Sequence, residues 1–321
     1  MSIWKWAALI VALLALTVSL LNGSWLAPAP AGKLMLIAHR GIVQPLREGA
    51  DPAACAAANM APNEHMFIEN SIFAIQHAAR EGADAIAVDV QATKDGRMAV
   101  FADSELDCRT DGKGALRDRT MAELKRLDIG HGYTADGGKT FPLRGRGVGA
   151  MPAVEDLLER VPGKQIIFSF AGSDPREADL LIAAFKRAGM EPGERFGFFG
   201  DAAVIARIKA LAPGAWAFSR QEIGACLPAY FKTGWTGIVP EPCRDTTIAI
   251  PLANQWRNWG WPNRFLARVN GAGSRTILAA DVTGGAIAGI ARPDQLAEVP
   301  RGYRGYLWVE DYYNIGRSLG R

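Results

Sequence analysis

The chain has 321 residues, of which 49% are hydrophobic and 21% charged. This composition is ordinary for a globular protein, and the length suits one large α/β barrel. The formal net charge of +3 is too small to indicate a polyanion partner, and no dense run of Lys and Arg interleaved with aromatic residues is present. We therefore expect no nucleic-acid partner.

The first thirty residues differ in kind from the rest, because no charged residue occurs from Trp6 through Ala31. The run from Trp6 to Leu26 would extend roughly 30 Å as a helix, which matches the hydrocarbon core of a bilayer. Lys5 precedes it, and tryptophans occur near both ends, where interfacial aromatics lie. The pattern predicts a transmembrane helix.

A cleaved signal peptide is the alternative, since APAPAG offers an A-x-A pattern that ends at Ala31. Pro30 fits a cleavage site poorly and the apolar run is long, so we favour an uncleaved anchor. Either interpretation makes 1–31 a targeting segment and 32–321 one exported domain. We expect that domain to be periplasmic or extracellular, and anchored to the membrane or, alternatively, secreted.

Short apolar runs alternate with amphipathic stretches along the exported part, which predicts buried parallel strands separated by helices. No nucleotide-binding glycine motif stands at a strand-to-helix turn. The expected class is a (β/α)₈ TIM barrel, with its chemistry at the C-terminal ends of the strands. The predicted strands are 34–38, 85–90, 98–102, 165–170, 195–199, 215–219, 237–240 and 276–281. The predicted helices follow Asn70, Thr120, Ala153, Pro175, Asp201 and Pro262.

Four cysteines, an even number, suggest disulfide bonds if the domain is exported. Cys55 and Cys108 lie in loops that follow the first and third predicted strands, and so overhang the same barrel mouth. Cys226 and Cys243 bracket the predicted seventh strand. We favour these two pairs, with four buried thiols as the alternative.

The segment IAHRG ends the first predicted strand with His39 and Arg40. Asp89 lies near the end of the second strand and Asp103 just after the third. The plain alternative is that Arg40 pairs with a core carboxylate. Since strand ends of a barrel converge, we instead expect these side chains to meet at a functional site.

These residues resemble the glycerophosphodiester phosphodiesterases. The motifs that carry the resemblance are HRG at 39–41, EN at 69–70, the stretch 82–114, TMAELKRLDIG, GAMPAVEDLLERVP and, more weakly, GIARPDQL. The resemblance implies a TIM barrel that hydrolyses glycerol-linked phosphodiesters with calcium or magnesium. It makes His39 a catalytic histidine, Arg40 a phosphate-binding arginine, and Glu69 and Asp89 metal-site positions.

Four other positions depart from the family pattern. Ala87 stands in place of a glutamate, Ala102 in place of the second histidine, Ser169 in place of a metal-binding glutamate, and Ala171 in place of a lysine. Alanine supplies no ligand, proton or charge, so metal binding should be weak or absent. We expect a degenerate member that binds a glycerophosphodiester or phospholipid head group near the membrane, a pseudoenzyme or binding module.

The alternative is an active phosphoric diester hydrolase with a rearranged site. In this alternative, polar residues of the long loop from Ile42 to Ile68 replace the missing groups. The candidate replacements are Glu48, Asp51, Glu64 and His65 from the loop, and Asp103, Asp107 and Arg109 beyond the third strand.

A role in envelope assembly, with the tryptophan-rich stretch 254–265 as a contact surface, is the third possibility.

Overall fold

The computed structural model describes residues 3–51, 54–62 and 64–320. Residues 1–2 of the predicted targeting segment 1–31 and residue 321 of the predicted domain 32–321 lie outside these ranges. The chain divides into two compact units. Unit 1 comprises Met1–Met35, Gln221–Ala288 and Asp294–Leu307. Unit 2 comprises Leu36–Arg220, Gly289–Pro293 and Trp308–Arg321.

Unit 2 contains a parallel sheet whose strands run in the order β6-β5-β4-β2-β1, with the short β3 paired antiparallel to β2. His39 pairs with Ala87, and Asp89 with Ser169, so these positions lie at neighbouring points of the sheet. Its elements are β1 (Leu34–His39, which begins in unit 1), α2 (Ile72–Arg80), β2 (Ala85–Ala92), β3 (Met98–Val100), α3 (Met121–Leu124), α4 (Val154–Arg160), β4 (Gln165–Phe170), α5 (Arg176–Arg187), β5 (Phe196–Gly200), α6 (Ala202–Leu211), β6 (Trp216–Ser219) and α9 (Tyr312–Ser318).

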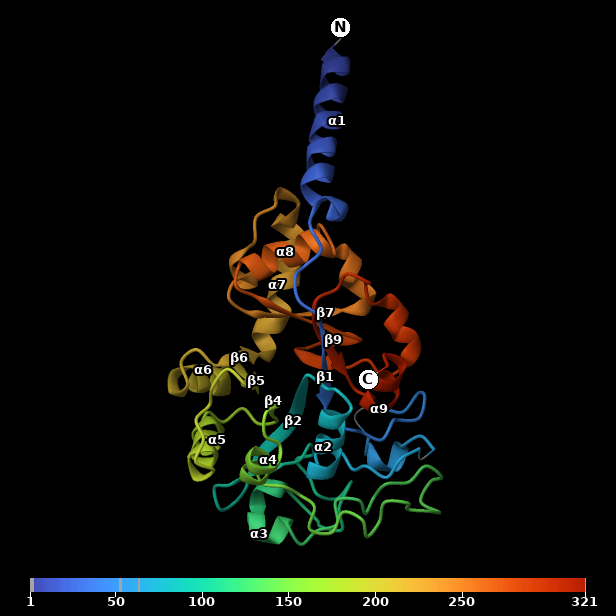
Figure 1. The fold of residues 1–321 in the computed structure, drawn as a ribbon, viewed down its shortest axis with the longest axis vertical. Helices are drawn as coiled ribbons and strands as arrows, with labels where there is room; N and C mark the ends of the chain where they lie inside the picture. The colour runs from blue at the N-terminus through green and yellow to red at the C-terminus, as the bar shows by residue number, and fades with distance from the viewer. Residues whose placement is uncertain (1–2, 52–53, 63, 321) are drawn as a thin grey trace. The chain divides into compact units, whose positions relative to one another are not determined.

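Unit 1 contains the strands β11, β8 and β7 in that order, all parallel, and a small β9–β10 hairpin. It also carries the N-terminal helix α1 (Figure 1). Its elements are α1 (Ile3–Asn22), η1 (Ser24–Leu26), α7 (Arg220–Thr233, whose first residue belongs to unit 2), η4 (Gly234–Thr236), η5 (Glu241–Cys243), β7 (Thr247–Pro251), η6 (Leu252–Arg257), α8 (Asn263–Gly271), β8 (Arg275–Ala279), β9 (Asp281–Thr283), β10 (Ala286–Ala288), η7 (Pro293–Glu298) and β11 (Gly305–Val309, which ends in unit 2).

The parallel strands alternate with helices, which confirms the predicted (β/α)₈ barrel class. Capping side chains define where several helices begin. Thr120 forms a capping box with Glu123, and Asp201 caps α6 by accepting a hydrogen bond from the Ala203 N–H. The strands are apolar on both faces because helices cover one face and the barrel interior the other; every residue of β5 is buried.

Two predicted barrel strands are wrong. The run 98–102 forms only the short antiparallel β3. The run 237–240 forms no strand, since Gly237 has φ 87° and Ile238 is exposed. Among the described residues, the parallel strands that were not predicted are β7, which begins at Thr247 after another threonine, and β11.

Both predicted disulfide pairs are present. Cys55 and Cys108 have Cα atoms 5.4 Å apart, and those of Cys226 and Cys243 are 4.7 Å apart. The second pair does not bracket a strand as predicted, because Cys226 lies in α7 and Cys243 in η5. This bond ties the middle of α7 to the segment that leads into β7.

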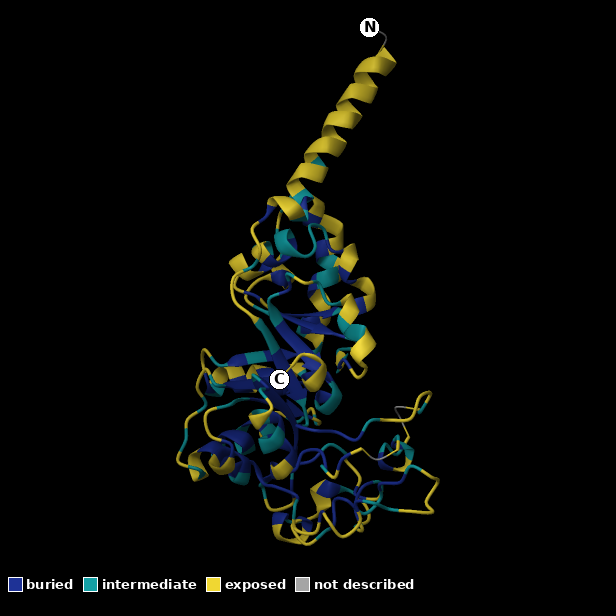
Figure 2. Cartoon of the chain, turned by 45° about the vertical axis from the view of Figure 1, so that its right-hand side comes forward, coloured by how far each residue is buried: buried dark blue, intermediate teal, exposed yellow. Residues whose placement is uncertain are grey.

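Helix α1 begins and ends earlier than the predicted span, at Ile3 and Asn22. Within the part of the chain that the structure describes, it is the one helix long and apolar enough to cross a membrane. None of its residues is buried, as Figure 2 shows by colour. A helix of 20 residues that is apolar all round and covered by no protein needs another apolar environment.

Candidate functional site

The backbone at position 41, directly after His39 and Arg40, can accommodate only a glycine. Its φ is +79°, and a Cβ atom there would lie 2.8 Å from the backbone of Ala74 and Ile75 in α2. A side chain at this position would therefore clash with the first turns of α2. The glycine lets the chain turn sharply at the end of β1, which leaves Arg40 at the strand end.

Arg40 and Asn70 both have left-handed backbones, with φ angles of 57° and 58°. Such angles are unfavourable for residues with a Cβ and cluster at functional sites. The Asn70 N–H donates to the Arg40 carbonyl at 2.9 Å, and the Arg40 N–H donates to the Ala87 carbonyl. The two strained residues therefore hold each other beside β2.

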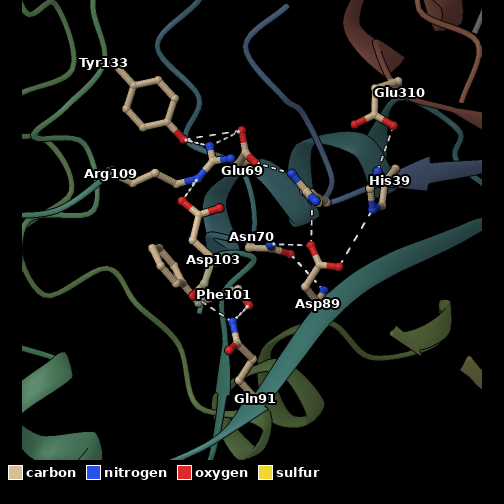
Figure 3. Close-up of polar contacts among 11 residues, drawn as sticks. His39, Glu69, Asn70, Asp89, Gln91, Phe101, Asp103, Arg109, Tyr133 and Glu310 are labelled. Atoms are coloured by element: carbon tan, nitrogen blue, oxygen red, sulfur yellow. Dashed lines mark hydrogen bonds and ion pairs between the residues drawn. The ribbon is translucent and has the colours of Figure 1, made fainter. Parts of the chain in front are cut away.

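Arg40 joins the two predicted acidic positions. Its Nε donates to Asp89 Oδ2 at 2.6 Å, and its Nη1 donates to Glu69 Oε1 at 2.9 Å. The Asn70 side chain also donates to Asp89 Oδ2, at 3.2 Å. The four predicted residues His39, Arg40, Glu69 and Asp89 therefore do meet in one place (Figure 3).

A second arginine holds the other side of Glu69. Arg109 Nη1 lies 3.0 Å from Glu69 Oε2, and Arg109 Nε donates to Asp103 Oδ2 at 2.8 Å. Tyr133 bridges the two, since its hydroxyl accepts from Arg109 at 2.8 Å and donates to Glu69 at 3.3 Å. Both Glu69 oxygens are thus engaged, and Arg109 is almost fully buried.

Glu310, at the end of β11, is the site residue that sequence reasoning missed. Its Oε2 accepts a hydrogen bond from His39 Nδ1 at 2.8 Å. The other ring nitrogen, Nε2, lies 3.9 Å from Asp89 Oδ1, beyond hydrogen-bond distance. One available signal was WVED, an acidic pair that directly follows an apolar run, which is where a strand of a barrel ends.

The carboxylates around His39 keep its ring positively charged. Burial by itself lowers the pKa of His39, but Glu310 and Asp89 outweigh it and raise that pKa to about 9. Burial would raise the pKa of Asp89, yet Arg40 and His39 hold it far below its usual range. At neutral pH the cluster therefore holds an imidazolium, two guanidinium groups and ionised carboxylates.

Sequence comparison relates part of this chain to a known family. Residues 56–177 match the model of the glycerophosphoryl diester phosphodiesterase family. Over 116 residues the chain is 37% identical to a glycerophosphodiester phosphodiesterase of Bacillus altitudinis, which is 36% of this chain and 47% of that relative. This part of the chain is similar to the glycerophosphodiester phosphodiesterases.

Other relatives match over similar parts. An uncharacterized Bacillus subtilis protein, YqiK, is 39% identical over 126 residues, which is 39% of this chain and 50% of the relative. The matched segments of the first three curated relatives span between 26% and 47% of their lengths. The match to the family model, residues 56–177, includes Glu69, Asp89 and Arg109.

Solved structures of phosphodiesterase-family proteins share the fold over nearly the whole chain. The corresponding domain of an uncharacterized Mycobacterium tuberculosis protein superimposes with a TM-score of 0.62 at 16% identity, covering 90% of this chain and 99% of the other. An Oleispira antarctica phosphodiesterase, solved with its product sn-glycerol-3-phosphate, gives 0.58 at 15% identity, covering 93% of this chain and 100% of the other.

The phosphodiesterase resemblance implies a divalent metal, and the residues present do not fit one. Across the described ranges, no group of three or more His, Cys, Asp or Glu side chains is placed to hold a metal ion. The oxygens of Glu69 are engaged by Arg40, Arg109 and Tyr133, and Asp89 Oδ2 by Arg40 and Asn70. A hard cation needs six to eight oxygen ligands, so a guanidinium on each carboxylate opposes its binding.

The four substituted positions add no ligand. Ala87 is fully buried on β2, and Ser169 is buried on β4 beside Asp89. Ala102 is half-buried next to Asp103, and Ala171 is exposed after β4. The positions where the phosphodiesterase pattern places two glutamates, a histidine and a lysine thus present small side chains.

The loop from Ile42 to Ile68 supplies no replacement histidine to the cluster. His65 is buried, and its ring contacts the Gln44 side chain and the Val43 carbonyl. Glu64 accepts from Asn314. Among the other candidates, Asp51 is exposed on the loop and Asp107 pairs with Lys113 at the surface.

A cavity of about 470 Å³ opens above the cluster, within the usual range for small-molecule sites. Arg40, Glu69, Arg109, Tyr133 and Glu310 form its floor, and the loop after β1 forms one side, including Glu48. The charged cluster is therefore accessible from solvent on this side.

Proposed function

We propose that this family member binds the phosphodiester group of a glycerophosphodiester, or of a phospholipid head group, without metal and without turnover. The observation that carries the proposal is the pairing of both acidic metal-site positions with arginines. Arg40 and Arg109 engage both oxygens of Glu69, and Arg40 engages Oδ2 of Asp89. The site therefore offers cationic N–H donors where a cation would need carboxylate oxygens.

Two donors are suited to a phosphodiester oxygen. His39 donates through Nδ1 to Glu310, and its Nε2 lies 3.9 Å from Asp89 Oδ1, with no acceptor within hydrogen-bond distance in the part of the chain that the structure describes. Arg40 uses Nε and Nη1, and among the described residues its Nη2 group has no acceptor. An imidazolium and an arginine fork both form strong, charge-assisted hydrogen bonds with a singly charged phosphodiester.

Loss of turnover follows from the groups that are missing. A general acid or base contributes about 10²- to 10⁴-fold in rate, and Ala102 cannot act as one. His39 is charged at neutral pH, so it cannot accept a proton there. Hydrolysis in the manner of the family would also need a cation to stabilise the developing charge, which this cluster does not fit.

The test is calorimetry and a hydrolysis assay on the full chain in nanodiscs. We expect glycerol 3-phosphate and glycerophosphoglycerol to bind with no calcium or magnesium present, calcium alone to give no heat, and no phosphodiester to be cleaved. Arg40→Met should abolish binding, whereas Arg207→Met, which removes an exposed ion pair with Asp179, should not. Calcium-dependent hydrolysis at enzymatic rates would overturn the proposal.

A gain-of-function variant sharpens this test. Ala87→Glu combined with Ala102→His restores the two groups that the family pattern places there. If degeneracy at these positions is the cause of inactivity, the double variant should bind calcium and cleave glycerophosphoglycerol. Each single variant should remain near background.

One observation favours a second candidate, an active phosphodiesterase with a rearranged site. A carboxylate on Nδ1 of a histidine is the arrangement that orients a general acid or base, and Glu310 supplies it to His39. With a pKa of about 9, His39 would work as an acid at neutral pH. Hydrolysis that is metal-independent and lost in His39→Ala would support this candidate.

The anchor and the location belong to the same proposal. Residues 1–31 anchor the chain through α1 and residues 32–321 form the exported barrel domain, in a compartment that favours both disulfides. The end of α1 is held within unit 1, since Arg268 donates to the Leu21 carbonyl and to the Asn22 side chain. A cation at this end of a helix is favourable.

Intact-mass measurement on membrane and soluble fractions tests the anchor. Retention of Trp6–Ala31 in the membrane fraction supports it. A soluble mature chain that starts at Gly32 would instead show a cleaved signal peptide.

A further inference from the structure

Unit 1 has a cavity of its own, of about 450 Å³, which the proposed function does not use. One wall is a face of α7, where Ile223, Leu227 and Phe231 repeat every fourth residue, next to Gly224, Pro228 and Lys232. The opposite wall comes from β7, η6 and β9, and its lining residues include Ala249, Pro251, Arg257 and Val282. The lining is mostly apolar, and each of the two walls carries one cation, Lys232 on α7 and Arg257 on η6.

The α7 wall is fixed in place. The disulfide between Cys226 and Cys243 ties the middle of the helix to η5. Towards its end, Tyr230 donates to the Trp259 carbonyl at 3.2 Å, and the Trp259 ring N–H donates to the Phe231 carbonyl at 2.9 Å. The cavity is therefore preformed, which reduces the ordering cost of binding.

The charges at the cavity are all of one sign. Lys232 and Arg257 line it, and no carboxylate does. The Arg257 guanidinium lies 5.3 Å from the centre of the Phe231 ring, which positions it over the apolar wall. Among the described residues, neither cation has an acidic partner or a hydrogen-bond acceptor. Two unpaired cations beside an apolar cavity are complementary to an amphiphile with a negative head group.

Gly224 leaves the space that such a chain would need. A Cβ atom built at this helical glycine meets nothing within 4 Å, although the residue lines the cavity. Pro228 also lacks an N–H, so the Gly224 carbonyl loses its usual helix partner and is available to a hydroxyl group. Glycine and proline both weaken a helix, so their position at the cavity wall is consistent with a binding role.

We propose that this cavity binds the alkyl chain of a monoacyl anionic lipid, with its phosphate group against Lys232 and Arg257. The same unit carries the apolar helix α1, so a lipid source would be close if α1 lies in a membrane. This site is separate from the charged cluster at His39. It does not depend on whether that cluster binds or cleaves a phosphodiester.

Photolabelling of the full chain in nanodiscs tests the proposal. The probe is dodecyl phosphate with a diazirine at the end of its chain, and labelled peptides are located by mass spectrometry. We expect labelling in Ile223–Lys232 that excess lysophosphatidylglycerol removes. Gly224→Phe should reduce it by about tenfold, as expected for the loss of an apolar subsite.

Two control variants make each outcome decisive. Gly271→Phe alters another exposed helical glycine with open space around it, outside the cavity, and should leave labelling unchanged. Lys232→Glu with Arg257→Glu should remove the preference for dodecyl phosphate over an uncharged dodecanol probe. Labelling confined to α1, or labelling of α7 that is insensitive to Gly224→Phe, would overturn the proposal.

A further titration separates this proposal from the proposed function. Glycerophosphoglycerol has no alkyl chain, so its binding should be the same in the parent protein and in Gly224→Phe. If Arg40→Met loses glycerophosphoglycerol binding but keeps the labelling of α7, the two sites bind their ligands independently. Loss of both in Gly224→Phe would show that the substitution disturbs the fold, and the milder Gly224→Leu then decides.

Discussion

Glu310 and His39 are 271 residues apart in sequence, and their side chains are joined by a 2.8 Å hydrogen bond. This bond fixes which nitrogen of the imidazole faces Asp89. It also sets the charge of the ring, because a buried carboxylate favours the protonated form.

Replacing Glu310 with Gln should lower the pKa of His39 from about 9 towards its ordinary value of 6.5, since the main favourable charge is lost while burial remains. The chain has four histidines, so the titration can be followed by NMR of labelled imidazole nitrogens, with His39→Asn for assignment. Glu64→Gln, which removes a carboxylate bonded to Asn314, should leave the curve in place. A His39 pKa unchanged in Glu310→Gln would contradict the prediction.

Stability should fall between pH 6.5 and pH 9 because of His39. Its folded-state pKa of about 9 lies above its ordinary value, so its stabilising contribution is complete below pH 6.5 and is lost as pH rises through 9. A pKa raised from 6.5 to about 9 corresponds to a contribution on the order of 3 kcal/mol. Denaturant unfolding of the parent and of His39→Gln across this range checks it, and the slope should be shallower in the variant.

Arg109→Met should destabilise the protein strongly. The change leaves the buried Glu69 carboxylate and the Tyr133 hydroxyl with fewer partners, and removal of one member of a buried ion pair costs about 3–5 kcal/mol. Arg207→Met breaks an exposed pair with Asp179 and should cost under about 1 kcal/mol. Equal unfolding midpoints for the two variants would show that the buried network contributes little.

Gly41→Ala should cost more than Gly49→Ala. Both glycines have φ near +75°, at +79° and +74°, but a Cβ at Gly41 meets backbone atoms of α2 at 2.8 Å, whereas one at Gly49 meets nothing within 4 Å. The left-handed backbone alone costs about 1–2 kcal/mol, and the clash adds about 1–3 kcal/mol more. The difference in free energy of unfolding between the two variants measures the clash.

Much of the site was predictable because its signals are local. HRG at the end of an apolar run, and EN just before a helix start, indicate polar residues at the C-terminal edge of a barrel, where parallel strands bring their ends together. His39, Arg40, Glu69 and Asp89 therefore meet as expected. The plain alternative was also correct in part, since Arg40 does pair with Asp89 and Glu69.

Local sequence patterns predicted the apolar N-terminal helix, the barrel class, the favoured disulfide pairs and the four residues that meet at the strand ends, because each depends on runs, caps and the order of elements. Tertiary structure decided which acids each cation meets and which runs become strands. Glu310 reaches His39, and Arg109 reaches Glu69, through contacts between distant segments. The run 237–240, in which Ile238 is exposed and the other residues are half-buried, differs from the largely buried β7 and β11 in burial rather than in composition. Burial and distant pairing are properties of the folded chain, and no local pattern specifies them.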